Sequence, residues 1–525
     1  MTSPQSRLRE RSGGVLLHPT SLAGPSEAGD LGPAAHAFVD FIAASGLTWW
    51  QVLPLCPPGA GDSPYSSSSV FAGSPTLVSL ERLRDDGLLD AGDPCFEPCT
   101  AERRVDFVKN RVRREGALRR AFERAKGSPE ARDAFDDFCR KSDYWLGPFA
   151  MFATLKRLHG ERAFFEWPRE HKRRDPEALR AVAAAHADEI GFHKFVQHRF
   201  ATDLAALVHH AHSRGVALMG DAPIYVAHDS ADVWANPELF QLDENGDPRA
   251  VAGVPPDAFS DEGQLWGNPL YDWDALARFG FGFWVARLGQ MLKSFDAVRL
   301  DHFIGFSRYY AVPRGETSAK KGTFHPVPGR ALFDAVYGAL GPVELVAEDL
   351  GVVTDEVRQL RDHFRLPGMS VLQFAFSPGA HAEASRPHNF PVHSVAYTGT
   401  HDNDTTVGWF SGPPDNASGD ARAHWEAERR FALSYLGLPD DTAAPDAARA
   451  LIRAAFRSQC RTIILPAQDL LGLGRETRMN RPGVADGNWS FRLLPGELTD
   501  EVAQRARSLA ELYGRIASGK AERLA

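Results

Sequence analysis

Eight short apolar runs recur along the chain, and stretches with helical spacing of apolar residues separate them. Near-continuous apolar runs that alternate with helices are typical of a parallel sheet covered by helices on both faces. Eight such strands favour a (β/α)8 barrel, an α/β fold of the TIM-barrel type, over an open doubly wound sheet. The runs begin at Gly14, Trp49, Gly215, Asp296, Glu344, Met369, His393 and Thr462, and clear helical stretches run from Pro33 to Ser45 and from Asp446 to Cys460.

Two intervals between the runs are too long for a simple connection between a strand and a helix. Residues 75–212 are rich in charged amphipathic stretches, and residues 227–288 are rich in Pro, Gly, Asp and aromatic residues. Insertions in a barrel enzyme accumulate at the carboxyl ends of the strands, where binding loops lie. We therefore predict one catalytic barrel spanning residues 1–525, with a largely helical insertion at 75–212 and a loop-rich insertion at 227–288 that covers an active-site cleft.

Charge and cysteine content exclude several classes of function. The net charge is −9, from 59 basic and 68 acidic residues, which gives no reason to expect nucleic acid or a membrane as a partner. Five cysteines in 525 residues are too few for a disulfide framework, and we expect reduced thiols. The polar residues 1–13 and the lack of a long apolar run predict a cytoplasmic protein. The histidines lack the spacing of a zinc site, so no metal is predicted.

Polar residues stand where several of the predicted strands end. In the fourth run Arg299 and Asp301 alternate onto one face of the strand, while His302 falls on the other. In the fifth run Glu348 and Asp349 face opposite ways, so that one can enter the barrel mouth while the other anchors a loop. Each pattern alone also fits a structural role, such as an ion pair at a strand end.

The same is true of the third and seventh runs. Asp221 leaves the third run, and Asp402 lies in a polar stretch directly after the seventh, where the simplest interpretation is an Asx-rich turn. Together, however, Asp301, Glu348 and Asp402 would converge at the carboxyl ends of the strands. Three convergent carboxylates without a metal pattern suggest acid–base or nucleophilic chemistry on an uncharged substrate.

The environments predicted for two of these carboxylates match the needs of a retaining glycosidase. Such an enzyme uses one ionised carboxylate as nucleophile and one protonated carboxyl as acid. Arg299 beside Asp301 would keep that group anionic. Glu348, facing an anion in a partly dry site, is expected to have a raised pKa and to hold a proton near neutrality.

The motifs around these residues resemble the 4-alpha-glucanotransferase family, also called amylomaltase or disproportionating enzyme, which is related to the alpha-amylases. The resemblance covers nearly the whole chain in order. It is carried by HPTSL at His18, DSPY at Asp62, GDAPIYVAHDSADVW at Gly220, GQLWGNPLY at Gly263, RLDH at Arg299, AEDLG at Ala347, GTHDNDT at Gly399, QDLLGLG at Gln468 and RMNRPG at Arg478.

The resemblance implies a role for each matched residue. Asp301 matches the nucleophile, Glu348 the general acid/base, and Asp402 the carboxylate that steadies the distorted sugar. Substrate-binding roles are implied or expected for Tyr65, Asp221, Arg299, His302, His401, Trp266 and Asn480. Three features depart from the family pattern: Ser66 to Ser69 replace bulkier residues, Ala258 replaces an aromatic, and Ile304 replaces an arginine. These departures concern the walls of the groove, on which acceptor preference depends.

The expected activity is transfer of an alpha-1,4-glucan segment to a 4-hydroxyl of glucose or another glucan, with alpha-1,4-glucans and maltooligosaccharides as substrates. The expected mechanism is a retaining double displacement that needs no cofactor. A retaining alpha-glucan hydrolase would use the same trio, and the family resemblance favours the transferase. A non-catalytic glucan-binding protein is a third alternative. The protein is predicted to be a monomer or a weak homo-oligomer.

Overall fold

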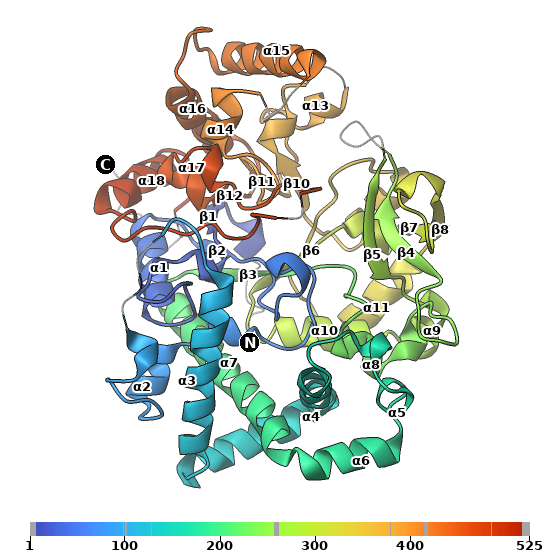
Figure 1. The fold of residues 1–525 in the computed structure, drawn as a ribbon. Helices are drawn as coiled ribbons and strands as arrows, with labels where there is room; N and C mark the ends of the chain where they lie inside the picture. Colours follow the sequence, from blue (N-terminus) through green and yellow to red (C-terminus); the bar gives the residue numbers. More distant parts are fainter. Residues whose placement is uncertain are drawn as a thin grey trace.

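Eight parallel strands form the centre of the molecule, as Figure 1 shows. The computed structural model describes residues 7–97, 99, 102–127, 129–256, 262–377, 380–413, 418–484 and 486–516. All eight predicted apolar runs contribute a strand, which confirms the barrel prediction. The strands are β1 Ser12–Leu16, β2 Trp49–Gln51, β3 Ala217–Ala222, β6 Ala297–Leu300, β9 Leu345–Ala347, β10 Gly368–Val371, β11 Ser394–Tyr397 and β12 Thr462–Pro466.

The sheet closes nearly completely into a barrel. Its strand order is β10-β11-β12-β1-β2-β3-β6-β9, and every neighbouring pair is parallel. Between the two outer strands, β9 and β10, the backbone N–H of Ala347 donates to the carbonyl of Pro367 at 2.9 Å. The carboxyl ends of all eight strands therefore meet at one end of the barrel.

Burial on both faces explains why these strands are apolar runs. Trp49 and Trp50 in β2 are 1% and 0% exposed, and the indole N–H of Trp50 donates to the carbonyl of Leu17 at 2.8 Å. Gly14 in β1 lies opposite Trp49, where an added Cβ would approach the tryptophan Cβ to 2.5 Å. Only a glycine at this position lets the two strands pair around so large a side chain.

Helices surround the barrel. The two helical stretches that the sequence predicted appear as α1 Pro33–Ala44 and α16 Ala444–Arg457. Helix α1 is followed by Gly46 with φ 67°, the left-handed conformation that terminates a helix. The outer helices also include α10 Gly282–Met291, α11 Gly329–Leu340, α12 Asp355–His363, α17 Ala467–Leu471 and α18 Asp500–Leu512. Three further helices lie near β10, β11 and β12 in Figure 1: α13 Ala380–Ala384, α14 Thr406–Ser411 and α15 Gly419–Leu436.

The segment between β2 and β3 is rich in helices, which lie at the bottom of the view in Figure 1. Buried polar contacts attach them to the barrel. The guanidinium of Arg114 in α3 is 1% exposed and donates to Asp30, which precedes α1, at 2.8 Å. The helices are α2 Leu80–Asp85, α3 Phe107–Ala125, α4 Pro129–Leu158, α5 Arg169–Lys172, α6 Pro176–Ala185 and α7 Ala187–Ser213.

A second, antiparallel sheet of four strands stands beside the barrel, at the right of Figure 1, in the order β5-β4-β7-β8. Its strands are β4 Ala250–Val254, β5 Gln264–Pro269, β7 Arg308–Pro313 and β8 Thr323–Pro326. Strands β4 and β5 lie between α8 Ala231–Ala235 and α9 Trp273–Arg278. The sequence did not predict the strands of this sheet; β8 is exposed along its whole length and lacks an apolar run, and β5 is largely exposed. Ala258 lies outside the described residues.

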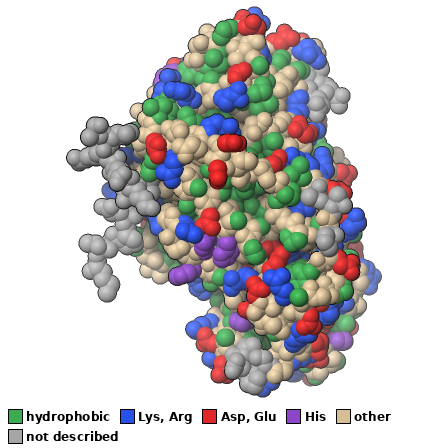
Figure 2. All heavy atoms as spheres, turned by 90° about the vertical axis from the view of Figure 1, so that its left-hand side faces the viewer, with side chains coloured by type: hydrophobic (Ala, Val, Ile, Leu, Met, Phe, Trp, Pro, Cys, Tyr) green, Lys and Arg blue, Asp and Glu red, His purple; other side chains and the backbone are tan. Residues whose placement is uncertain are grey.

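The surface carries side chains of both signs. Figure 2 shows the face that lies on the left in Figure 1, where acidic and basic groups are interspersed. All five cysteines are free thiols, as predicted. Within the described part of the chain, no helix is long and apolar enough to cross a membrane.

Candidate active site

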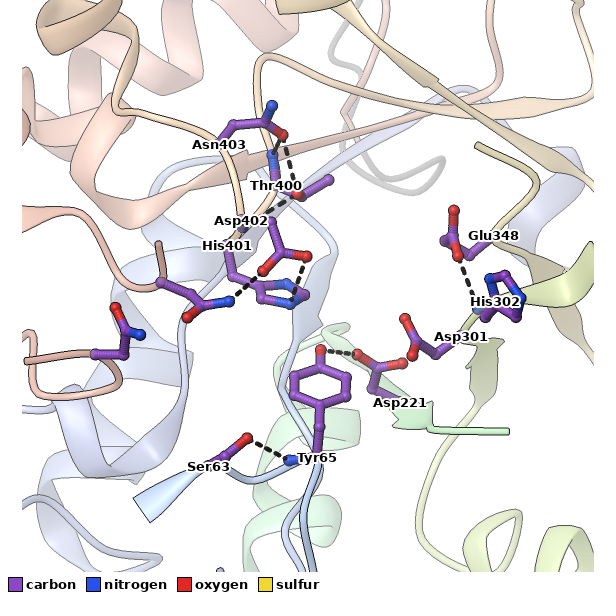
Figure 3. A network of polar contacts seen from close by, with 12 residues as sticks. Ser63, Tyr65, Asp221, Asp301, His302, Glu348, Thr400, His401, Asp402 and Asn403 are labelled. Atoms are coloured by element: carbon purple, nitrogen blue, oxygen red, sulfur yellow. Dashed lines mark hydrogen bonds and ion pairs between the residues drawn. The ribbon is translucent and has the colours of Figure 1, made fainter. Parts of the chain in front are cut away.

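A cleft of about 2930 Å³ opens at the carboxyl ends of the barrel strands. Asp301 directly follows β6, Glu348 directly follows β9, and Asp402 lies in the loop after β11. All three carboxylates line this one cleft. The structure therefore brings together the trio that the sequence placed after its fourth, fifth and seventh runs, and Figure 3 shows them around a common opening.

A buried arginine, Arg299, joins Asp301 to a second carboxylate, Asp221. Arg299 donates to Asp301 at 2.8 Å and to Asp221 in β3 at 2.6 Å, and the hydroxyl of Tyr65 also donates to Asp221 at 2.6 Å. Burial opposes the positive charge of Arg299, but Asp221 and Asp301 outweigh it and keep its pKa well above the ordinary value. Arg299 thus stays cationic and fixes Asp301 by a charge-assisted hydrogen bond.

Glu348 sits beside Asp301 with two backbone donors on its carboxyl group. One oxygen accepts from the N–H of His302 at 2.7 Å and the other from the N–H of Leu350 at 2.9 Å. Burial raises the pKa of Glu348 and the charge of Asp301 raises it further, whereas Arg299 and the two N–H groups lower it; the result is a pKa of about 8. Glu348 consequently holds a proton at neutral pH, as the sequence predicted.

His302 has a left-handed backbone, with φ 53° and ψ 55°. Strand alternation predicted that its side chain would face away from Asp301, but the turn ends the strand there, and His302 lines the same cleft. This conformation carries strain for a non-glycine residue. It directs the His302 N–H toward Glu348. Burial lowers the pKa of the His302 imidazole to about 4, so the ring is neutral. Its ring meets Trp266 of β5 edge-on at 4.8 Å.

Asp402 is held by groups from the loop after α17. The side-chain amide of Asn480 donates to one Asp402 carboxylate oxygen at 2.6 Å, and Arg478 donates to the Asp402 backbone carbonyl. The polar stretch also forms a turn, because the Asn403 N–H donates to the Thr400 carbonyl at 3.3 Å and the Asn403 side-chain oxygen accepts from the Thr400 N–H at 2.8 Å. The Asp402 side chain stays 44% exposed toward the cleft. The stretch therefore forms a turn and also leaves the Asp402 carboxyl group open to the cleft.

Three aromatic rings gather between Asp221 and Asp402. Tyr65 stacks on His401 with 5.0 Å between the ring centres, and Trp489 lies 5.6 Å from Tyr65 and 5.9 Å from His401. All three rings line the cleft. The sequence analysis did not single out Trp489, which stands in a Gly- and Asn-rich loop with φ 64°. Only its order in the chain after RMNRPG could have drawn attention to it.

Two remaining sequence features have structural explanations. Asp349 turns away from Glu348, accepting from Arg361 at 2.6 Å and from the Met369 N–H at 2.8 Å, so it anchors the loop as the strand alternation predicted. In the serine run, Ser67 donates to the Pro57 carbonyl at 2.9 Å and holds the loop that carries Tyr65.

Taken together, the cleft presents a carboxyl group bonded to a buried cation, a neighbouring carboxyl group with a raised pKa, and a third, exposed carboxyl group. This combination fits double displacement at an acetal carbon. Aromatic faces beside it suit the apolar faces of sugar rings. In the described residues, no group of three or more His, Cys, Asp or Glu side chains is arranged to hold a metal ion.

Comparisons with known proteins point the same way. Residues 17–498 match the sequence profile of a family described as 4-alpha-glucanotransferase. The 4-alpha-glucanotransferase of Thermus thermophilus is 45% identical over 515 residues, covering 96% of this chain and 99% of that protein. That of Synechocystis is 42% identical, covering 97% and 99%. A solved structure of an amylomaltase from Streptococcus agalactiae in complex with acarbose has a TM-score of 0.90 at 33% identity and covers 96% of this chain and 100% of that one.

Proposed function

Because the chain belongs to the 4-alpha-glucanotransferase family, glycoside hydrolase family 77, we propose that Asp301, Glu348 and Asp402 carry out its reaction. The activity is that of a 4-alpha-glucanotransferase acting on alpha-glucans. One observation supports the assignment of roles above the others: Asp301 is bonded to buried Arg299, while Glu348 beside it has a pKa of about 8. The two carboxyl groups therefore have different environments, a cation partner for the nucleophile and a raised pKa for the acid.

The proposed reaction has two displacements. Glu348 protonates the oxygen of the scissile alpha-1,4 bond while Asp301 attacks the anomeric carbon from the opposite face, which releases the fragment on the reducing-end side. Asp402 holds ring hydroxyls in the flattened geometry of the transition state. A 4-hydroxyl of the acceptor then attacks the anomeric carbon of the Asp301 ester while Glu348 takes its proton, and the bond to Asp301 breaks to release the carboxylate. Two inversions retain the configuration, and no cofactor is needed.

We assign the substrate contacts to side chains that line the cleft. Tyr65, His302, His401 and Trp266 line the cleft, and we assign them contacts with the sugar. Asp221 is 2% exposed behind Arg299, so we assign both residues the positioning of Asp301. In the same way, Asn480, which lines the cleft, both holds Asp402 and reaches substrate.

A transferase must let a sugar hydroxyl compete with water for the ester on Asp301. Exclusion of water and good acceptor contacts achieve this. We propose that the insertions at 75–212 and 227–288 border the cleft for this purpose. Supporting this proposal, Phe149 and Phe192 of the first insertion and Trp266 of the second line the same cleft as the carboxylates.

We further propose that the protein is a monomer or a weak homo-oligomer. Light scattering on a sizing column measures this oligomeric state.

The test of the proposed roles is incubation with maltotriose, followed by chromatography of the products. The wild-type protein is expected to produce glucose together with oligosaccharides longer than maltotriose. Asp301→Asn and Glu348→Gln should each lower turnover by several orders of magnitude while keeping the fold, as checked by circular dichroism. Near-wild-type turnover in either folded variant would refute the assignment. Glucose and maltose alone would show a hydrolase on the same trio.

A further inference from the structure

The cleft continues past Glu348 into an arm that the proposed mechanism does not use. One wall of this arm is the loop at 350–353 that follows Glu348, and the other is the outer part of the small sheet, where Arg308, Tyr310 and Phe324 line the cleft. Ile304 lies against the first wall, since its Cδ1 is 4.0 Å from the position of a Cβ on Gly351. The arm therefore begins at the acid Glu348 and ends at β8.

Phe324 stands at the far end of this arm and is 44% exposed, whereas Val352 in the opposite loop is 67% exposed. Phe324 is on the outer strand β8, and Trp266, beside His302, is on the other outer strand, β5. Neighbouring strands lie about 4.8 Å apart, so the three strand intervals between β5 and β8 span roughly 14 Å. Both rings line one cleft, whose lining therefore extends over the small sheet from β5 to β8.

The Phe324 ring is held in place from below and from the side. Tyr310 is its cross-strand partner, with 4.9 Å between ring centres, and Tyr310 is anchored by a hydrogen bond from its hydroxyl to the Ala319 carbonyl at 2.9 Å. The guanidinium of Arg308 lies 4.3 Å from the ring centre. An aromatic ring fixed before binding loses little freedom on contact with a ligand.

We infer that Phe324 and Arg308 form an acceptor-side platform that binds glucose units of a maltooligosaccharide beyond the unit next to Glu348. The inference rests on the proposed function, because the leaving and accepting sugars occupy the side of the acid. The apolar face of a pyranose packs on the exposed part of the Phe324 ring, while Arg308 donates to sugar hydroxyls. A glucose acceptor is too short to reach the platform, so the platform selects for longer acceptors.

The experiment is a comparison of acceptors with the donor held fixed. The full-length protein transfers from amylose to radiolabelled glucose or to radiolabelled maltotetraose, and KM and kcat are measured for each acceptor. In Phe324→Ala, KM for maltotetraose should rise about threefold to tenfold, the loss of one aromatic contact. KM for glucose and both kcat values should stay at the wild-type level. Phe324→Trp, which keeps an aromatic face, should preserve the low KM for maltotetraose.

Phe279→Ala is the matched control, because Phe279 is 60% exposed and is absent from the cleft lining. It should leave both KM values unchanged, and melting curves confirm that each variant is folded. An unchanged KM for maltotetraose in Phe324→Ala, or an equal rise for both acceptors, would overturn the inference while leaving the proposed function standing. Absence of any transfer by the wild-type protein would instead overturn the proposed function and the inference with it.

Discussion

The pH dependence of bond cleavage is the property that the site geometry determines most directly. The cleft raises the pKa of Glu348 from 4.5 to about 8, first by burial and then by the charge of Asp301. At pH 7 a carboxyl with a pKa of 8 is about nine-tenths protonated, whereas one with a pKa of 4.5 is roughly 0.3% protonated. The environment therefore increases the fraction of protein holding the catalytic proton by about 300-fold at neutrality.

The sign of the effect follows from which form is active. Glu348 must be protonated to donate to the leaving oxygen, so the activity is present below its pKa in the folded protein and is lost as pH rises through that value. We expect kcat/KM to stay level from neutrality to about pH 8 and then to fall about tenfold per pH unit. The kcat/KM of maltotriose cleavage, measured from about pH 4 to pH 10, reports this ionisation in the free enzyme.

A donor that needs no acid provides the control. Fluoride leaves without a proton, so alpha-maltosyl fluoride should react with Asp301 without the loss above pH 8 that maltotriose shows. Two results would refute the reasoning. A fall in kcat/KM for maltotriose that begins near pH 5 would mean that the cleft does not raise the pKa of Glu348. An identical alkaline fall for both donors would assign the ionisation to another group.

Two stability predictions follow from buried arginines. Replacing Arg299 by Met leaves Asp221 buried without its 2.6 Å cation partner, and the free energy of unfolding in urea should fall by about 3–5 kcal/mol; unchanged stability would contradict the ion-pair role. Arg515, which is 0% exposed, donates to the backbone carbonyls at Ser12, Phe456, Ser458, Cys460 and Arg461. Arg515→Ala should cost at least about 3 kcal/mol in the same assay with kcat unchanged, and a lower kcat in the folded variant would show a link to the site instead.

The barrel could be predicted from the sequence because its strands are buried on both faces. Such strands are continuous apolar runs, and the polar residues that end them, Asp301 and Glu348 among others, mark the carboxyl edge of the sheet. The small sheet could not be predicted in the same way. Its strands β5 and β8 are largely exposed, so burial does not select an apolar pattern in them.

The contacts within the site that the sequence did not reveal join distant segments of the chain. Asn480 holds Asp402 across 78 positions of the chain, and Trp489 joins the rings of Tyr65 and His401 from a separate loop. The aim of His302 toward Glu348 depends on one left-handed backbone conformation, which strand alternation does not describe. The pattern of apolar residues in a strand predicts which face of the strand is buried. It does not predict which distant loop contacts the end of that strand.

The central claim is that Asp301 forms the covalent bond to the transferred sugar. In Glu348→Gln, an activated donor such as alpha-maltosyl fluoride still supplies a leaving group, while the base that activates the acceptor is gone, so the ester should accumulate. Mass spectrometry of the quenched and digested protein measures it directly. We predict a maltosyl adduct on the peptide that contains Asp301, at the Asp301 side chain. An adduct on Asp402 or another carboxylate, or donor turnover with no adduct on any peptide, would contradict the mechanism.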